Sequence, residues 1–320
     1  MTFAGSPDRG EVRLVADAGF EFDPFRIGGL PRRPGLALAQ GLLIAARAVR
    51  ACGRILRARR PDVVLGGGGY VAGPMVMAAS GRRIPAALME VDAHLGLANR
   101  LAAPFARRVF LAFPIDGHSG KKYRVTGRAI PARSRAIPRA EARKLFELPA
   151  SGPVLVVFGG SQGALSLNEL TVEAFGEAGP AVLHLSGERG YESLRERVQR
   201  GDYRLLPYTD DFGAALAAAE LALSRSGGVV WELAAAGTPA VLVPYPHATG
   251  DHQTKNARYF EAGGGAVVVP EPELERVPGL VRELLEDAPR LERMREAMLR
   301  AARPDAAEEI AEELMALARA

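Results

Sequence analysis

The sequence predicts an α/β fold of two domains, each built around a parallel sheet. Short apolar runs, such as residues 154–158 and 221–223, alternate with helix-length segments along the chain. Several of these runs end in a glycine-rich turn that leads into a helix, which is the order of elements in a parallel sheet. With 320 residues, 48% of them hydrophobic, the chain can bury two cores of about 150 residues each.

Cysteine content and hydropathy exclude several classes of protein. Cys52 is the only cysteine, so an internal disulfide and a cysteine-ligated metal site are excluded, which suits a reducing cytosol. No run of about 18 uncharged apolar residues occurs, and no signal peptide opens the chain. We therefore expect a protein that neither spans a membrane nor is secreted.

The net charge of +4 conceals an asymmetry between the two halves of the chain. Residues 1–146 carry 25 Lys and Arg against 10 Asp and Glu, a net of +15; the remainder carries 16 against 27, a net of −11. A basic half joined to an acidic half predicts that the first half meets an anionic partner. The high arginine usage of GC-rich genomes is the alternative explanation.

The apolar runs and the turn residues place the elements in order. Strands are predicted at residues 2–4, 20–22, 62–65, 86–89, 109–113, 123–127, 154–158, 181–186, 204–207, 221–223, 240–243 and 266–269. Helices are predicted at 11–18, 36–60, 73–80, 138–148 and 229–236, and terminal helices at 291–320. Residues 149–153 form the expected linker between the domains.

The predicted helix at residues 36–60 has an apolar face and a basic face. At about 100° per residue, arginines gather opposite the apolar face, with three apolar residues beside them near the helix start. Residues 26–61 contain nine arginines and no acid. A solvated helix face and a surface that contacts anionic lipid both fit this pattern. The candidate lipid-facing residues are Leu36, Leu43, Ile44, Arg47, Arg50 and Arg54.

Two segments of the first half follow predicted strands and favour a ligand site. The strand at 62–65 ends in four glycines and a tyrosine, a composition that lets the backbone approach a ligand closely. Glu90, Asp92 and His94 follow the strand at 86–89, at the end of the strand where open α/β sheets bind ligands. An ordinary turn is the alternative for the glycine segment.

The segment 221–257 carries the clearest pattern of the second half. A strand leads into the turn SRSGG at 224–228 and then into the helix at 229–236. Backbone N–H groups before a helix can bind an anion, and Glu232, one turn into the helix, can accept hydrogen bonds from a ribose diol. The alternative is an ordinary βαβ unit in which Glu232 stabilises the helix.

Three stretches resemble the MurG-type enzymes of glycosyltransferase family 28. They are PDVVLGGGGYVAGP at 61–74, VLVVFGGSQGALSLN at 154–168, and the turn at 224–228 followed by residues 232–239 and DHQTKNA at 251–257. The resemblance runs over nearly the whole chain, with the motifs in the family's order. It implies a GT-B fold, in which two Rossmann-like domains face a cleft and a terminal helix returns to the first domain.

The resemblance also implies an activity. The family transfers GlcNAc from UDP-GlcNAc to lipid I (undecaprenyl-pyrophosphoryl-MurNAc-pentapeptide), which gives lipid II in peptidoglycan synthesis at the cytoplasmic side of the cell membrane. The implied partners are UDP-GlcNAc, lipid I and an anionic membrane surface. No cofactor, metal or nucleic acid is expected. The transfer would be inverting, with backbone N–H groups stabilising the departing diphosphate.

The resemblance places the donor site mainly in the second half. Thr209 would contact the uracil ring, Glu232 the ribose, and His252 and Gln253 the sugar hydroxyls. Arg128 stands where the family has asparagine, so either Arg128 or Arg133 could face the donor. The implied donor-binding residues are Ser161, Gln162, Gly163, Thr209, Ser226, Gly227, Gly228, Glu232, His252, Gln253, Arg128 and Arg133.

The acceptor side departs further from the family. The implied acceptor-binding residues are Gly67, Gly68, Gly69 and Tyr70. Candidates for the general base are Glu90, Asp92 and His94, with Glu90 ranked first because the family has a carboxylate there. The family's GGTGGH-type loop has no counterpart, so we expect Met1 to be an internal start of a chain about 30–40 residues longer.

We therefore expect a first domain at 1–148, a second at 149–300, and a C-terminal helix at 301–320 that packs on the first domain. Two alternatives to the implied activity stay open. One is a related GT-B transferase with another nucleotide sugar or lipid acceptor, since this architecture alone does not select a substrate. The other is a non-catalytic relative that binds a UDP-sugar or a membrane.

Overall fold

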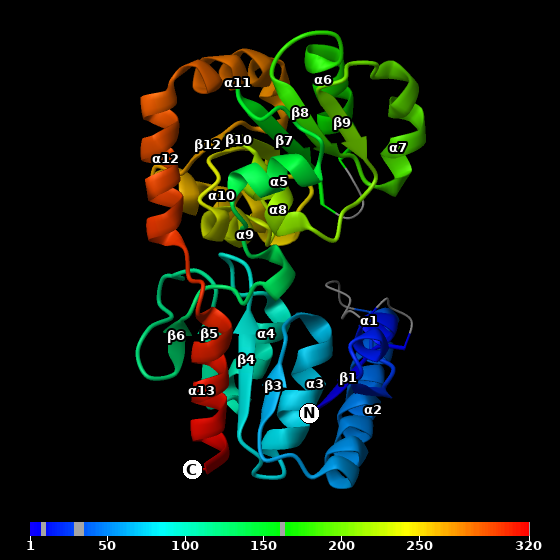
Figure 1. Cartoon of the computed structure of the whole chain (residues 1–320). Coiled ribbons are helices and arrows are strands. Elements are labelled where there is room, and N and C mark those ends of the chain that lie inside the picture. Colours follow the sequence, from blue (N-terminus) through cyan, green and yellow to red (C-terminus); the bar gives the residue numbers. More distant parts are fainter. Residues whose placement is uncertain (8–10, 29–34, 161–163, 320) are drawn as a thin grey trace. The chain divides into compact units, whose positions relative to one another are not determined.

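The structure is a computed structural model that describes residues 1–7, 11–28, 35–160 and 164–319. These residues form two compact units, one of Met1–Thr126 with Glu308–Ala320 and one of Gly127–Ala307 (Figure 1). All paired strands within named sheets run parallel. The predicted α/β class is confirmed.

The first unit contains two separate parallel sheets. One pairs β1 (Thr2–Gly5) with β2 (Glu21–Pro24), and the other has the order β3-β4-β5-β6. The strands of the second sheet are β3 (Val64–Gly66), β4 (Ala86–Glu90), β5 (Arg108–Leu111) and β6 (Tyr123–Val125). The helices are α1 (Glu11–Asp17), α2 (Leu36–Arg59), α3 (Gly69–Ser80), α4 (Leu97–Ala102) and α13 (Ala306–Arg319), with a short 3-10 helix η1 (Ala103–Phe105).

Helix α2 contributes one face to the core of the first unit. Ala48, Cys52 and Leu56 are buried in a cluster with side chains of α3, β3, β4 and β5. Burial raises the pKa of the Cys52 thiol to about 12, which keeps it protonated and inert at neutral pH. The apolar face that the sequence predicts therefore packs inward.

Helix α13 returns to the first unit. Ile310 and Leu317 pack with Ala87 of β4 and Phe110 of β5 in a small buried cluster. Glu313 forms ion pairs with Arg108 Nε at 3.3 Å and with Arg124 at 3.4 Å. Apolar contacts and ion pairs together hold the C-terminal helix on the β4–β6 part of the sheet.

Helix α3 begins earlier than the sequence analysis expected. The expected start was residue 73, because proline is normally tolerated only in the first turn of a helix. The structure starts α3 at Gly69 and keeps Pro74 inside it. Gly68 and Gly69 have φ of 99° and 66°, so glycine is what allows the chain to enter the helix there.

The second unit is built on a six-stranded parallel sheet of order β12-β11-β10-β7-β8-β9. Its strands are β7 (Val154–Phe158), β8 (Ala181–Leu185), β9 (Tyr203–Leu206), β10 (Leu221–Ser224), β11 (Ala240–Leu242) and β12 (Ala266–Val268). The first strand lies beside the fourth, which is the order of a Rossmann fold. Every residue of β7, β8, β10 and β11 is buried, as expected of strands covered on both faces.

Helices accompany this sheet (Figure 1). They are α5 (Arg139–Leu145), α6 (Leu165–Phe175), α7 (Glu188–Leu194), α8 (Phe212–Ala218), α9 (Val230–Ala236), α10 (His252–Ala262), α11 (Val277–Glu286) and α12 (Ala288–Ala301). Short 3-10 helices lie at η2 (Ala132–Ser134), η3 (Arg195–Arg197), η4 (Thr249–Asp251) and η5 (Glu271–Arg276). Among the described helices, none is long and apolar enough to cross a lipid bilayer.

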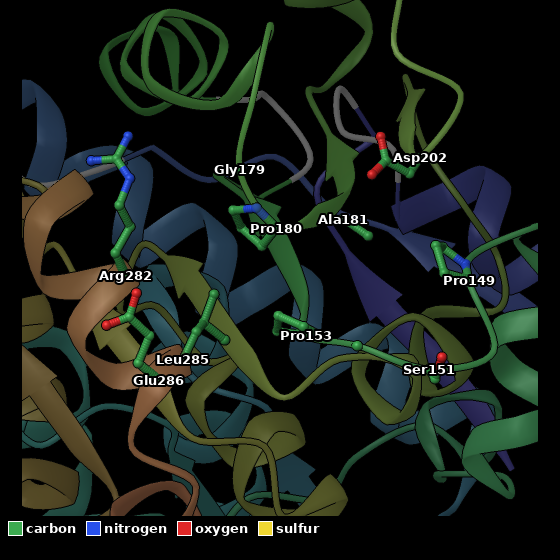
Figure 2. A pocket seen from close by; sticks show the side chains of 11 residues that line it. Pro149, Ser151, Pro153, Gly179, Pro180, Ala181, Asp202, Arg282, Leu285 and Glu286 are labelled. Atoms are coloured by element: carbon green, nitrogen blue, oxygen red, sulfur yellow. The ribbon is translucent and has the colours of Figure 1, made fainter.

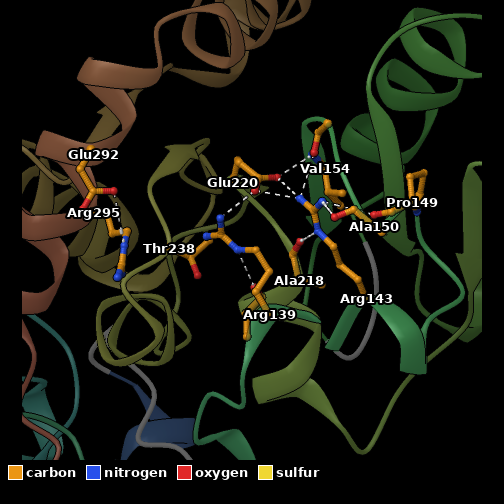
Figure 3. A network of polar contacts seen from close by, with 12 residues as sticks. Arg139, Arg143, Pro149, Ala150, Val154, Ala218, Glu220, Thr238, Glu292 and Arg295 are labelled. Atoms are coloured by element: carbon orange, nitrogen blue, oxygen red, sulfur yellow. Dashed lines mark hydrogen bonds and ion pairs between the residues drawn. The ribbon is translucent and has the colours of Figure 1, made fainter. Parts of the chain in front are cut away.

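The division between the units falls before α5, not after it as the expected boundary at residue 148 implies. Figure 3 shows the reason, the buried side chain of Arg143 on α5. Its Nε donates to the carbonyl of Ala218 at 3.1 Å, and its Nη2 lies 2.7 Å from Glu220 Oε2. The same carboxylate oxygen accepts the backbone N–H of Val154 at 2.8 Å, at the start of β7. These bonds tie α5 to the second sheet, so Gly127–Ala307 forms one unit.

Candidate functional site

The topology of the second unit points to one edge of its sheet. In a Rossmann sheet, ligands bind outside the carboxyl ends of the strands, where the strand order reverses. That point lies between β7 and β10, whose residues Phe158 and Ser224 are paired at their carboxyl ends. The glycine-rich segment after β7 includes Ser161, Gln162 and Gly163, which lie outside the described residues. The turn after β10 is described and carries the rest of the site.

An arginine lies directly on the turn after β10. A Cβ placed on Gly228 would be 1.4 Å from Nη1 of Arg128, so the guanidinium occupies the space that any other side chain would fill. Gly227 is approached by Gln253 instead, whose Nε2 is 4.0 Å from a Cβ at that position. Ser226 is buried, and its hydroxyl donates to the carbonyl of Gln253 at 2.8 Å. Two side chains that donate hydrogen bonds, Arg128 and Gln253, therefore lie beside the glycines of the turn.

Glu232 accepts a hydrogen bond from a residue in a distant part of the chain. Its Oε1 accepts a hydrogen bond of 2.5 Å from the hydroxyl of Ser134, which is 2% exposed. Arg133, the neighbour of Ser134, lies 3.6 Å from Asp210 in the loop after β9. Of the two arginines that the sequence left open, Arg128 lies at the turn and Arg133 pairs with Asp210.

The loop after β9 lies next to the segment that carries Arg133 and Ser134. Thr209 Oγ1 accepts the backbone N–H of Asp211 at 3.1 Å, which shapes the loop just before α8. A Cβ on Gly213, in the first turn of α8, would be 2.3 Å from the carbonyl oxygen of Arg135. Only glycine permits this close approach of α8 to the segment that carries Arg133 and Ser134.

Hydrogen bonds orient the two polar residues at the start of α10. The backbone N–H of Tyr245 donates to Gln253 Oε1 at 2.9 Å, so the amide presents its NH₂ group on the other side. His252 Nδ1 lies 2.9 Å from the carbonyl of Thr249 and donates a hydrogen bond to it, which fixes the orientation of the ring.

In the first unit, the glycine segment and the loop of Glu90 lie side by side at the ends of β3 and β4. Gly66 pairs with Leu88, and a Cβ on Gly68 would be 3.2 Å from the carbonyl oxygen of Met89. Gly67 and Gly69 face open space. Gly67 and Gly69 are thus exposed, next to the loop that contains Asp92 and His94.

Glu90 points into its own loop. The side chain is 7% exposed, and Oε2 accepts from the backbone N–H of Gly96 and from Asn99 Nδ2, each at 2.9 Å. Its Oε1 lies 3.4 Å from the backbone N of Asp92. Asn99 Oδ1 is also buried and has no hydrogen-bond partner among the described residues. The Glu90 carboxylate holds the loop, and Asp92 and His94 are only partly buried.

The basic surface of α2 is exposed as the wheel predicts. Leu43 is 51% and Ile44 42% exposed, and the side chains of Arg47, Arg50 and Arg54 are exposed as well. The side chain of Leu36 lies outside what the structure describes. Apolar and cationic groups share this surface of the first unit.

Two further observations concern a pocket away from this site and the possibility of a metal centre. A pocket lined by Pro153, Ala181, Asp202 and Arg282 opens at the amino ends of β7 and β8, the edge of the sheet opposite Glu232 (Figure 2). In residues 1–7, 11–28, 35–160 and 164–319, no three His, Cys, Asp or Glu side chains gather as a metal site would require.

Sequence reasoning missed two residues of the site. Ser134 lies 98 positions from Glu232, and Asn99 is nine positions from Glu90. Neither belongs to a pattern that predicts its partner, because contacts of this kind depend on the tertiary fold.

A six-stranded Rossmann unit and a second parallel α/β unit to which the terminal helix returns define a GT-B glycosyltransferase fold. Residues 2–111 match the glycosyltransferase family 28 N-terminal domain, and residues 154–310 match the family's C-terminal domain. The chain belongs to glycosyltransferase family 28.

Two named relatives and one solved structure also support membership of this family. The UDP-N-acetylglucosamine–N-acetylmuramyl-(pentapeptide) pyrophosphoryl-undecaprenol N-acetylglucosamine transferase of Halothermothrix orenii is 36% identical over 95% of this chain and 87% of its own. The transferase of the same name from Salinibacter ruber is 40% identical over 99% of this chain and 88% of its own. The crystal structure of Acinetobacter baumannii MurG is similar with a TM-score of 0.75 and 25% identity, over 98% of this chain and 90% of that one.

Proposed function

We propose that the protein is a MurG-type enzyme that transfers GlcNAc from UDP-GlcNAc to lipid I and forms lipid II. The observation that carries the proposal is the turn after β10, where Arg128 lies on Gly228 and Gln253 approaches Gly227, with Glu232 in the helix that follows the turn. Family membership and the names of relatives with 36% and 40% identity support the same substrates.

The second unit would bind the donor nucleotide. Glu232, fixed by Ser134, would accept hydrogen bonds from the ribose hydroxyls, and Arg128 would neutralise charge on the diphosphate. Gln253 and His252 would bind hydroxyls of the sugar. By resemblance, Ser161, Gln162 and Gly163 would add donors to the phosphate or sugar, and the backbone of Thr209 would contact the uracil ring.

The reaction would be an inverting displacement at the anomeric carbon. A hydroxyl of the acceptor sugar attacks that carbon, the bond to UDP breaks, and the departing diphosphate takes the negative charge. Arg128 and the N–H groups of Gly227 and Gly228 would stabilise this charge as it develops. A base must accept the proton of the attacking hydroxyl.

The first unit would bind the acceptor and supply the base. Gly67, Gly68, Gly69 and Tyr70 would contact the acceptor through their backbone. The sequence ranked Glu90 first as the base, but its oxygens accept bonds from its own loop. We therefore infer that Glu90 positions the loop and that Asp92 or His94 accepts the proton. Asn99 Oδ1, which is buried without a partner among the described residues, would accept from the acceptor or from a bound water.

The surface of Leu36, Leu43, Ile44, Arg47, Arg50 and Arg54 would attach the protein to the cytoplasmic side of the cell membrane. Each basic residue near anionic lipid contributes about 1 kcal/mol, so three together would hold the protein at the surface reversibly. In liposome flotation, Arg47→Glu, Arg50→Glu and Arg54→Glu combined should abolish binding. The same three reversals at Arg293, Arg295 and Arg300 on α12 serve as the control, and equal flotation of both would exclude the surface.

A turnover assay tests the main proposal. Wild-type protein is incubated with UDP-GlcNAc and a lipid I analogue, and Glu232→Gln is assayed beside it. We expect lipid II from wild type and a UDP affinity of Glu232→Gln that is weaker by about 10- to 100-fold, because a charge-assisted bond contributes about 1.5–3 kcal/mol. Tight binding of another sugar nucleotide would favour a related transferase, and UDP binding without turnover would favour a non-catalytic relative.

A further inference from the structure

An ion pair between the buried Arg225, in the turn after β10, and the partly exposed Glu271 is not part of any assignment made above. Arg225, the second residue of the turn SRSGG, is 8% exposed, and its Nη1 is paired with Glu271 Oε2. Its Nη2 lies 3.1 Å from Glu271 Oε1, so the contact is bidentate. Glu271 is the first residue of η5 and follows the end of β12 after Val269 and Pro270.

The same guanidinium fixes the segment that follows β11. Arg225 Nη1 donates to the carbonyl of Val243 at 3.2 Å, and the guanidinium carbon lies 5.6 Å from the centre of the Tyr245 ring. The backbone N–H of Tyr245 in turn orients the amide of Gln253. Arg225 thus acts, through Tyr245, on a residue that approaches Gly227.

The pair also holds the beginning of α6. Arg225 Nη2 donates to the hydroxyl of Ser166 at 2.9 Å, and that hydroxyl donates to Glu271 Oε1 at 2.7 Å. Ser166 is the second residue of α6, the helix that follows the glycine-rich segment after β7. One ion pair therefore connects the segments that follow β7, β10, β11 and β12.

The charge of Glu271 is needed for this arrangement. Burial by itself would raise the pKa of the Glu271 carboxyl, but the hydrogen bonds from Arg225 and Ser166 outweigh burial and leave the pKa below its ordinary value. The carboxylate is therefore ionised at neutral pH. Without it, the buried guanidinium of Arg225 would have only neutral acceptors, and a buried charge that lacks its partner is strongly unfavourable.

We propose that Arg225 and Glu271 form a positioning pair that sets the spacing of the donor-binding segments. The inference rests on the proposed function, because the segments concerned are those assigned to UDP-GlcNAc. The pair has no direct contact with the donor in this proposal. It holds Gly227 and Gly228, Gln253 and the start of α6 in the arrangement that binds the diphosphate before the ligand arrives, so binding does not have to order them.

The test compares two identical substitutions on η5. Glu271→Gln removes the charge that pairs with Arg225 at constant size, and Glu273→Gln removes the exposed charge that pairs with Arg276 on the same element. Isothermal titration with UDP should show an affinity about tenfold weaker for Glu271→Gln, equivalent to about 1.4 kcal/mol, and no change for Glu273→Gln. In steady-state kinetics the KM for UDP-GlcNAc should rise more than kcat falls.

Two further measurements separate positioning from general loss of stability. Amide hydrogen exchange should accelerate at residues 226–229 and 243–245 in Glu271→Gln while the strands of the sheet stay protected. Arg225→Lys keeps a charge but cannot reach Glu271, Ser166 and Val243 together, so it should weaken UDP binding as Glu271→Gln does. Glu271→Asp, which keeps the carboxylate, should recover part of the affinity.

The outcomes are distinct. If wild type binds UDP and Glu271→Gln binds it as tightly as Glu273→Gln does, the positioning pair is refuted and the proposed function survives. If wild type binds no UDP, the proposed function fails, and hydrogen exchange decides the inference by itself. Equal exchange at 226–229 in Glu271→Gln and Glu273→Gln would overturn it in either case.

Discussion

Replacement of Arg143 by methionine tests whether α5 belongs to the second unit. Arg143 is 4% exposed, and the five N–H groups of its guanidinium contact six acceptors, four backbone carbonyls and both oxygens of Glu220. Methionine keeps most of the apolar stem of the side chain and removes every one of these contacts. Glu220 then keeps only the backbone N–H of Val154 and the guanidinium of Arg139.

The expected loss is large because a buried pair is broken from one side. Removal of one partner of a buried ion pair typically costs about 3–5 kcal/mol, since the other charge and its acceptors stay desolvated. Arg139→Met removes another partner of the same Glu220 carboxylate, but the Arg139 side chain is 49% exposed. An exposed pair contributes about 0–1 kcal/mol, so the two substitutions should differ by at least about 2 kcal/mol.

Urea unfolding followed by tryptophan fluorescence measures this difference. Trp231 is the only tryptophan, is 2% exposed and lies on α9, so its emission reports the second unit specifically. The transition of Arg143→Met should move to lower urea with an unchanged slope. Equal midpoints for Arg143→Met and Arg139→Met, or a loss below about 1 kcal/mol for Arg143→Met, would refute the assignment of the Arg143 network as a main support of this unit.

Three shorter predictions follow from single contacts. Burial lowers the pKa of His184 to about 3, below its value in the unfolded state, so the unfolded state binds the proton first as the pH falls. The free energy of unfolding is therefore full above about pH 6.5 and falls by roughly 2 kcal/mol on going to pH 5. His184→Asn should remove this loss, which urea titrations at the two pH values would measure. Ser134→Ala should weaken UDP binding by roughly 2- to 12-fold in calorimetry, because Glu232 loses its orienting bond of about 0.5–1.5 kcal/mol. Gly228→Ala should displace Arg128 and weaken UDP binding by more than about tenfold without a change in the urea midpoint, and wild-type affinity would exclude Arg128 from the site.

Most of the fold could be predicted because its central strands are buried on both faces. Such strands appear in the sequence as continuous apolar runs, and β7 was predicted with the same bounds, residues 154–158. The start of α3 was predicted wrongly, because Pro74 normally marks the first turn of a helix and the preceding glycines concealed the true start. A continuous apolar run is thus enough to predict a buried strand, whereas the local sequence around Pro74 gives the wrong start for α3.

From the residues alone, the turn at 226–228 and Glu232 could be predicted as a candidate site, because they lie in the turn and the helix that follow a strand. Gln253 and Arg128 became candidates only through the family resemblance. Two contacts of the site join segments about 100 residues apart: Arg128 lies against Gly228, and Ser134 donates a hydrogen bond to Glu232. No local pattern predicts such a pairing. The expected boundary at residue 148 differs from the structure for the same reason, because the partners of Arg143 are spread over residues 149–220.

The membership of α13 in the first unit bears on how the protein is synthesised. On the ribosome, Ala87 and Phe110 are synthesised long before Ile310 and Leu317, which pack against them in the folded protein. Until then the nascent amino-terminal part displays an uncovered apolar surface, of the kind that chaperones recognise. The β3–β6 sheet thus reaches its final packing only after α13 has been synthesised, and a chain truncated before Ile310 would leave the face of Ala87 and Phe110 uncovered.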